Sequence, residues 1–345
     1  MSSAFEPPFA KRLREISEGT RPMPQTDSRK QHYVPSFLLA QWATPPKRKG
    51  TLYELLIATG KVKATKPGNV SWQRDLYTVD KAANSSVLIV EAFLGIIEDA
   101  AADPIKNLAT LPTTISDEDR ATIAFFLALQ QFRTPVGMAQ NRTVSELAAQ
   151  ASIAAFLGNR EAVTERYRTL INPDGTDEEI RAFARDLIAD FKQGKLKIKL
   201  PPEAPQQAML KLVSLMANDV VTMSWTLIEA VDGEFIASDR GLAMWDPNLP
   251  PQRGNAWASS PQAETAIPVG PKVCLKITPG AEGFAVERAD KQTVDAINLR
   301  TYGWAEQAVF GRTQDVVEEV HRAAEADPSQ VPRPKVPPVP ARPGT

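Results

Sequence analysis

Cysteine and histidine are scarce in this chain, and their scarcity excludes several kinds of site. The 345 residues include one cysteine, Cys274, and two histidines, His32 and His321. A disulfide framework and a cysteine-based zinc site are therefore excluded. Any metal site must depend mainly on carboxylates, and any histidine-based catalysis must use one of these two histidines.

Long apolar runs and common catalytic motifs are also missing. No stretch approaches the roughly 18 consecutive apolar residues of a membrane-spanning helix, and the first residues lack the apolar centre of a signal peptide. We therefore expect a cytoplasmic protein with no membrane partner. Glycine-rich phosphate loops, the H-E-x-x-H zinc motif and the G-x-S-x-G nucleophile elbow do not occur. These absences argue against nucleotide-phosphate cradles, zinc proteases and common serine hydrolases.

The composition is that of a globular protein, but the charge is unevenly spread. Hydrophobic residues make up 43% of the chain and charged residues 23%, which predicts a folded core. Residues 1–81 carry 14 Lys and Arg against 7 Asp and Glu, whereas the rest of the chain has a net charge of −8. Such a basic front part is either a solvated segment or a surface for a phosphate-bearing partner such as nucleic acid.

Both ends of the chain read as segments outside the core. Residues 1–29 are polar and show no sustained apolar period, which predicts a flexible basic arm. Residues 327–345 contain 7 prolines in 19 positions, which favours extended polyproline II and predicts a disordered, proline-rich tail. The tail is either a solvated linker or a ligand for a partner protein with an aromatic groove.

Between these ends, residues 30–326 are expected to form a single α+β domain. Two short runs at 51–57 and 61–66, around Gly60, predict an N-terminal hairpin. From Val87 apolar residues recur every three to four positions, with Ser116 and Thr176 as N-caps and Pro135 as a break. This pattern predicts a mostly helical body, with helices at 87–109, 116–133, 145–158, 160–170, 178–193 and 203–219.

The C-terminal half has a β-like period. The segments 223–231 and 234–238, joined at Asp232-Gly233, predict a second hairpin. Two more strands are expected at 266–269 and 272–278, and all four should form one small antiparallel sheet. Helices at 289–310 and 313–325 complete the chain. Strands segregated from a helical body are the pattern of an α+β fold.

The segment around His32 carries the most specific motif. Residues 31–35 read Q-H-Y-V-P and precede an apolar run, so we expect them to dock on the core. This string resembles the hallmark of a bacterial family of unknown function, domain-of-unknown-function family 4238, and the resemblance covers roughly residues 30–312. The other matching positions follow in order: Glu98, Gln130, Arg133, Thr134, Pro135, Ser238, Asp239, Pro268, Pro271 and Asn298. The resemblance implies a shared layout and no mechanism.

Two departures from the family pattern are visible. Arg240-Gly241 follows Ser238-Asp239 where the family has Asn-Pro, and Val269-Gly270 stands where it has Leu-Ser. The first departure weakens any role that depended on the asparagine amide.

The candidate site is centred on polar residues that stand among apolar neighbours on predicted helices. Glu98 and Arg133 each stand among apolar or small neighbours on predicted helices, so both should be partly buried and each requires a partner. Their pair would be either a structural ion pair or part of a catalytic site. We expect His32 and Asp239 to join them in one polar cleft, with these substrate-binding residues around it: Gln31, Tyr33, Gln130, Ser238 and Asn298.

Three functions fit such a cleft. In the first, Glu98 and Asp239 hold Mg²⁺ or Mn²⁺, His32 acts as general base or ligand, and Arg133 stabilises the phosphoryl charge in a nuclease-like hydrolysis of phosphodiester bonds. In the second, the same residues form the rigid polar core of a non-catalytic binding module. In the third, the protein is a small-molecule sensor in which Arg133 binds a carboxylate or phosphate.

Overall fold

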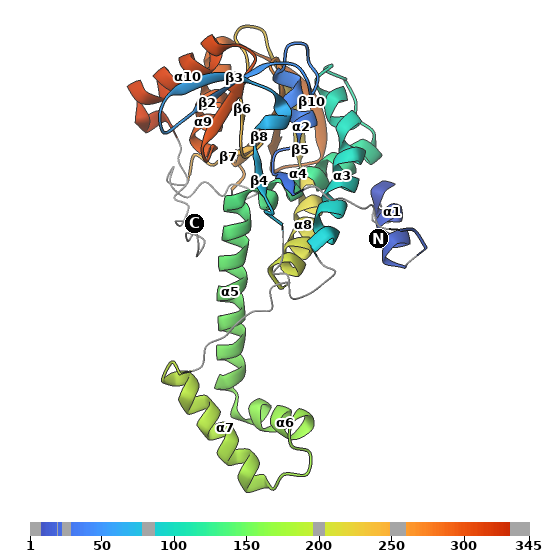
Figure 1. Ribbon diagram of the computed structural model, residues 1–345, viewed down its shortest axis with the longest axis vertical. Helices are drawn as coiled ribbons and strands as arrows, with labels where there is room; N and C mark the ends of the chain where they lie inside the picture. The colour runs from blue at the N-terminus through green and yellow to red at the C-terminus, as the bar shows by residue number, and fades with distance from the viewer. Residues whose placement is uncertain are drawn as a thin grey trace. The chain divides into compact units, whose positions relative to one another are not determined.

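A computed structural model describes residues 8–18, 20–22, 29–77, 87–195, 204–248 and 260–331 (Figure 1). The chain divides into two compact units, one formed by residues 1–138 and 210–345 and the other by residues 139–209. The first unit contains all the described strands together with helices, so the predicted α+β class is confirmed. The division itself differs from the expected single domain at 30–326.

A five-stranded sheet lies in the first unit, in the order β10-β5-β9-β8-β7. Its strands are β5 (Ser224–Ala230), β7 (Ala243–Trp245), β8 (Glu264–Gly270), β9 (Val273–Thr278) and β10 (Gly283–Ala289). Strand β10 pairs in parallel with β5, whereas the other pairs are antiparallel. Three of these strands were expected. Helix α9 (Lys291–Trp304) contributes Val294 and Ile297 to a buried cluster with Ile228 and Cys274 of this sheet.

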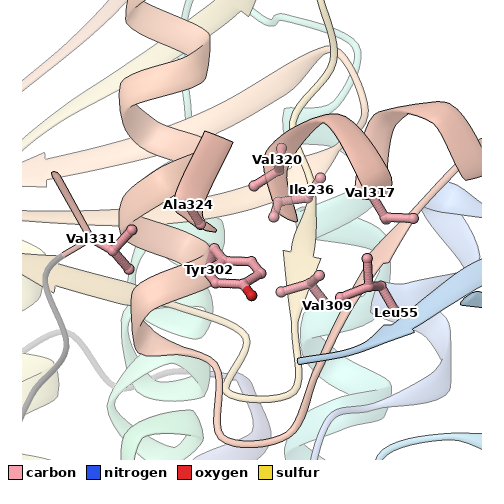
Figure 2. Close-up of a cluster of buried hydrophobic side chains, with 8 residues drawn as sticks. All are labelled: Leu55, Ile236, Tyr302, Val309, Val317, Val320, Ala324 and Val331. Atoms are coloured by element: carbon pink, nitrogen blue, oxygen red, sulfur yellow. The ribbon is translucent and has the colours of Figure 1, made fainter. Parts of the chain in front are cut away.

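A second sheet has four antiparallel strands in the order β3-β2-β11-β6. The predicted N-terminal hairpin is confirmed as β2 (Leu52–Leu56) and β3 (Lys61–Thr65), and Gly60 has the positive φ, 64°, that its tight turn requires. Strand β6 (Ala237–Ser238) and strand β11 (Ala308–Gly311) complete the sheet. Helix α10 (Gln314–Ala326) packs on it and buries the cluster shown in Figure 2: Leu55, Ile236, Tyr302, Val309, Val317, Val320, Ala324 and Val331.

The expected hairpin of 223–231 with 234–238 is wrong, because its two segments enter different sheets. Strand β5 pairs with β9 and β10, whereas β6 pairs with β11. The backbone between them is bound by other partners: the Asn298 side chain accepts from Ile236 N at 3.0 Å and donates to Glu234 O at 2.8 Å. Trp42 Nε1 donates to Phe235 O at 2.7 Å. These long-range bonds replace the ladder that a hairpin would form.

The helix expected at 289–310 is also corrected, since α9 ends at Trp304 and β11 follows it. Ala305 is extended, with φ −61° and ψ 143°. The N–H groups of residues 306–308 donate to the Asp239 carboxylate instead of continuing the helical ladder. A side chain distant in sequence therefore ends this helix.

Two long helices carry the candidate site residues. Helix α3 spans Val87–Leu108, and α4 spans Asp117–Arg133 with Ser116 Oγ accepting from Asp119 N at 3.1 Å, as predicted. Helix α4 stops where expected, because Thr134 before Pro135 is extended.

Short elements lie around α3 and α4. They are α2 (Ser36–Leu39), the 3-10 helices Ala40–Trp42 and Pro67–Asn69, and the two-stranded ribbon of β1 (Lys30–His32) and β4 (Trp72–Arg74).

The second unit is helical. It contains most of α5 (Pro135–Gly158), α6 (Arg160–Leu170) and α7 (Asp177–Lys192), and α8 (Ala204–Thr222) begins in it. The predicted cap of α7 is confirmed as a full capping box of Thr176 with Glu179. Leu157, Val163 and Ala184 form its buried cluster.

The described parts of the two chain ends contain structure that the composition did not predict. Helix α1 (Pro8–Ser17) lies within the expected arm, and its Phe9 is buried with its ring 4.9 Å from that of Phe125. At the other end, Val331 is buried after a 3-10 helix at Pro328–Gln330. The rest of the expected tail, 332–345, lies outside the described residues. Among the described helices, none has both the length and the apolar character to cross a membrane.

Candidate functional site

An ion pair between α3 and α4 forms the centre of the candidate site. Arg133 Nη2 donates to Glu98 Oε1 at 2.6 Å, and the side chains are 2% and 24% exposed respectively. The same nitrogen donates to the backbone carbonyl of His32 at 2.6 Å. Burial is the largest single effect on Arg133 and opposes its charged form, but the attractions of Glu98 and Tyr77 and their hydrogen bonds together outweigh it and raise the pKa of the guanidinium. The expected pairing is thus present, and it holds the Q-H-Y-V-P segment.

The His32 side chain lies at the edge of this pair, half-buried. Its Nε2 is 3.2 Å from Gly68 O, and because a carbonyl only accepts, Nε2 carries the proton and Nδ1 keeps a lone pair. Burial lowers the pKa of His32 from 6.5, while the Gly68 hydrogen bond opposes the shift, and Lys30, Glu98 and Arg133 add smaller effects. The ring is therefore mainly neutral at pH 7 and able to accept a proton.

Two further groups, neither of them expected from the sequence, complete this first cluster. Burial raises the pKa of Glu91 to about 7, with repulsion from Glu98 adding to the shift and Arg133 opposing it. Tyr77 donates from its hydroxyl to Arg133 O at 3.0 Å, and burial raises its pKa to about 12. Glu91 stands seven residues before Glu98, two helical turns on the same face of α3, so this spacing was a usable signal.

Two nitrogens of the Arg133 guanidinium form no hydrogen bond with the described residues. Its Nε and Nη1 are buried and find no hydrogen-bond acceptor among the described residues. Glu91 Oε2 is similarly buried without a hydrogen-bond partner there. Buried polar groups of native proteins are normally satisfied. These three atoms therefore give the cluster hydrogen-bonding groups that the Arg133–Glu98 ion pair does not use.

Asp239 has a different role from the one expected. It is 1% exposed, and its carboxylate accepts from Glu306 N at 2.8 Å, Gln307 N at 2.7 Å and Ala308 N at 3.2 Å. Burial raises its pKa to about 6, although these three bonds and Arg240 oppose the shift. Both oxygens are thus occupied by backbone, which makes Asp239 a connector between β6 and the end of α9.

A second buried cluster surrounds Asp239. Arg240 lies with its guanidinium 4.9 Å from the ring centre of Trp304, and its Nε is 3.7 Å from Glu306 Oε1. Burial raises the pKa of Glu306 to about 7, with repulsion from Asp239 adding to it and Arg240 opposing it. Arg240 stands at one of the family departures, so in this chain a cation and its stacking partner replace an amide there.

Gln130 connects the two clusters. Its Nε2 donates to Tyr33 O at 2.8 Å and to Arg240 O at 3.1 Å. Gln130 and Arg133 are three residues apart and face the same side of α4, so one helix face holds successive carbonyls of the Q-H-Y-V-P segment. The Tyr33 ring is half-buried, and burial together with the charge of Asp239 raises its pKa. The distant motifs of the chain therefore meet in one polar network.

The remaining expected binding residues use their polar atoms on backbone groups. Gln31 Oε1 accepts from Tyr77 N at 2.7 Å, and Ser238 Oγ accepts from Arg240 N at 3.4 Å. Asn298 binds the segment before β6, as described above. All three are buried. Their geometry makes them positioning residues.

The residues expected to hold Mg²⁺ or Mn²⁺ do not fit that role. Glu98 Oε1 is bound to Arg133, and both oxygens of Asp239 accept from backbone N–H groups. Within the described ranges, no three His, Cys, Asp or Glu side chains gather closely enough to hold a metal ion. Glu98 and Asp239 instead bind a guanidinium and backbone N–H groups.

One known protein family matches most of the chain. A family described as "Protein of unknown function (DUF4238)" matches residues 30–315, which contain every residue of both clusters. No curated protein and no solved structure matches the chain. Because the match covers most of the sequence, this chain belongs to the DUF4238 family of proteins of unknown function.

Proposed function

We propose that this protein cleaves phosphodiester bonds of RNA by general acid–base catalysis at His32 and Glu91, with Arg133 stabilising the charge of the phosphoryl group. The observation that supports the proposal most directly is the buried Arg133 guanidinium with two nitrogens left without acceptors among the described residues, next to acids on α3 and a neutral imidazole. Preorganised N–H donors in a dry site stabilise charge that develops on a phosphoryl group.

The two titratable groups have protonation states suited to opposite tasks. His32 has a lowered pKa and a lone pair on Nδ1, which suits a general base at neutral pH. Glu91 has a pKa of about 7, so a large share of it keeps its proton at neutral pH and can act as a general acid. A base and an acid whose environments shift their pKa values in opposite directions are the usual arrangement for such catalysis.

The reaction balances without a metal. His32 Nδ1 takes the proton of a ribose 2′-hydroxyl, whose oxygen attacks the adjacent phosphorus, and Glu91 gives its proton to the leaving 5′-oxygen as the phosphorus–oxygen bond breaks. The products are a cyclic 2′,3′-phosphate and a free 5′-hydroxyl. The ribose itself holds the nucleophile beside the phosphorus, which supplies the proximity that a metal-bound water would otherwise require. Glu98 acts as a positioning residue that keeps Arg133 charged and in place.

A second candidate is a non-catalytic binding module. It is favoured by the extensive use of motif side chains on backbone groups, since Gln31, Gln130 and Asn298 all hold the chain in place. In that case the first cluster would bind an anionic ligand at Arg133 without changing it. The two candidates differ in whether a bound RNA is cut.

The test is to incubate the full-length protein with end-labelled single-stranded RNA or DNA, in EDTA and separately with Mg²⁺ or Mn²⁺. We expect cleavage of RNA and not of DNA, in EDTA, leaving cyclic phosphate ends. Glu91→Gln should reduce the rate about 10²–10⁴-fold, the usual contribution of one acid–base group. Asp99→Asn, an exposed carboxylate on the same helix, is the matched control and should cut at the wild-type rate.

Other outcomes decide against the proposal. Cleavage that requires Mg²⁺ or Mn²⁺, or a Glu91→Gln variant with the wild-type rate, would contradict the assigned mechanism. Binding of RNA without cleavage under every condition would support the binding module.

A further inference from the structure

The β1–β4 ribbon presents one face on which an aromatic side chain lies among cations. Its antiparallel register pairs Lys30 with Arg74 and His32 with Trp72. Because side chains alternate along a strand, these four share one face, and Gln31 with Gln73 share the other. Gln31 is 4% exposed, whereas Trp72 is 41% exposed, so the second face is inward and the first is outward.

Trp72 is held in place although it is exposed. Its Nε1 donates to Asn69 O at 3.1 Å, which fixes the indole over the 3-10 helix at Pro67–Asn69. Lys30 Nζ lies 4.6 Å from the ring centre and donates to Gly68 O at 2.6 Å. An exposed tryptophan with a fixed orientation loses little entropy when a flat ligand stacks on it, which is how single-stranded nucleic acids bind to aromatic side chains.

The charge of this face matches a phosphate backbone. The side chains of Arg74 and Arg29 are 68% and 54% exposed, and both approach Asp75, at 3.7 Å and 3.4 Å. One partly exposed carboxylate therefore faces two arginines, and Lys30 adds a third positive charge. Positive charge alone would suit an acidic peptide as well as a nucleic acid. Trp72 favours the nucleic acid, because an aromatic side chain stacks with bases.

We propose that single-stranded RNA binds this face, with one base stacked on Trp72 and flanking phosphates on Arg74 and Lys30. The choice of RNA as the polyanion rests on the proposed function. His32 lies on the same face as Trp72, directly opposite it in the ladder. A strand stacked on Trp72 would therefore pass beside the imidazole that the proposed function assigns as the base.

The binding test uses fluorescence anisotropy of a fluorescein-labelled oligouridylate, within the range of about 4–16 nucleotides that single-strand binding folds cover. The measurement is made in EDTA on the Glu91→Gln variant, so that the probe stays intact. Trp72→Ala in this background should weaken binding about 5–150-fold, the loss of one stacked base, and Trp72→Phe should restore most of it. Phe156→Ala, which removes a similarly exposed aromatic from α5, is the matched control and should bind as the parent does.

The charge contribution has its own readout. Arg74→Gln should weaken binding and reduce the slope of log affinity against log salt by about 0.7, the value for one phosphate contact of a single strand. Equal binding by the parent, Trp72→Ala and Arg74→Gln would overturn the proposed surface, as would full displacement of the probe by polyglutamate. If these variants lose binding while wild-type protein never cuts RNA, the surface stands and the proposed catalysis fails. If wild-type protein cuts RNA and both variants bind RNA as the parent does, the proposed catalysis stands and the proposed surface fails.

Discussion

Arg133 depends on its partners because it is 2% exposed and carries a full charge. Glu98 is its only carboxylate ion pair among the described residues, and it is itself 24% exposed. Removing one member of a buried pair costs about 3–5 kcal/mol, because the remaining charge is left without compensation. The pair therefore stabilises the contact between α3 and α4 whether or not the site is catalytic.

We predict that Glu98→Ala lowers the free energy of unfolding by about 3 kcal/mol, the low end of that range because Glu98 is partly exposed. Urea denaturation at neutral pH measures this value. Asp99→Ala, one residue along the same helix and exposed, should change it by less than about 0.5 kcal/mol. A Glu98→Ala variant as stable as the Asp99→Ala control would show that Arg133 finds another partner.

The second cluster should make stability depend on pH. Burial raises the pKa of Glu306 to about 7 and that of Asp239 to about 6, so the folded state keeps protons that the unfolded chain releases near pH 4. The contribution of these acids to stability is therefore greatest at low pH and falls as the pH rises to about 7. His32 acts in the opposite sense, since its lowered pKa disfavours folding below about pH 6.5.

Glu306→Gln isolates one of these acids from the rest. The variant is neutral at every pH, so it should gain stability relative to the wild type between about pH 5 and about pH 8. The quantity to measure is the difference in free energy of unfolding between wild type and variant, by urea denaturation at both pH values. A difference that is the same at both would mean that Glu306 titrates as it does in the unfolded chain.

Among the elements, α9 and β11 show how a distant side chain sets a boundary. The Asp239 carboxylate accepts three successive backbone N–H groups after Trp304, and these bonds redirect the chain from helix to strand. The pairing of β11 with β6 and β2 follows directly from that turn. Asp239 thus supports the four-stranded sheet from within.

Asp239→Asn should therefore destabilise the fold. An amide has one acceptor oxygen and carries N–H donors that face backbone N–H groups, so we expect a loss of about 2–3 kcal/mol, typical of a broken bond to a charged acceptor. Urea denaturation at about pH 8, where Asp239 is ionised, measures the loss. Asp290→Asn is the matched control: it changes the exposed N-cap of the same helix, where Asp and Asn are nearly equivalent. Loss of RNA cleavage by Asp239→Asn at unchanged stability would instead assign Asp239 to the reaction.

On the scale of the whole molecule, the last described residues belong to the core of the first unit. Val331 is 5% exposed and lies in the cluster of Figure 2 with Tyr302 and Ala324. The chain was expected to leave the core at 327, but this contact holds it to α10 for a few residues more. The proline content of 327–345 did not reveal this contact, because one buried valine leaves no periodic pattern.

Val331→Ala should lower the free energy of unfolding of the full-length protein by about 1–2 kcal/mol, for the loss of buried methyl groups and the small cavity that remains. Chemical denaturation with a fluorescence readout measures it. Gln330→Ala, the exposed neighbour, serves as control and should be neutral within about 0.5 kcal/mol. Equal stability of the two variants would show that the cluster does not need Val331.

Local patterns in the sequence were enough to predict the elements that are stabilised locally. Helices α4 and α7 begin at the expected caps, β2 and β3 form the expected hairpin, and Glu98 pairs with Arg133 as their apolar surroundings required. For the caps and the hairpin the physical cause lies within a few residues: a hydroxyl that satisfies a free N–H, or a glycine that accepts positive φ. For Glu98 and Arg133, which are 35 residues apart, the apolar neighbours on each helix showed that both charges would need a partner.

The tertiary structure decided what depends on partners far along the chain. Strands β5 and β6 lie in different sheets, and Asn298 and Trp42 bind the backbone between them. Helix α9 ends at Trp304 because the Asp239 carboxylate accepts the N–H groups that follow. The tertiary structure also gave Asp239 a backbone role in place of a metal, and brought Glu91 to Arg133. A polar side chain offers the same hydrogen-bonding groups wherever it folds, and only packing selects its partner, so these assignments could not be read from local pattern.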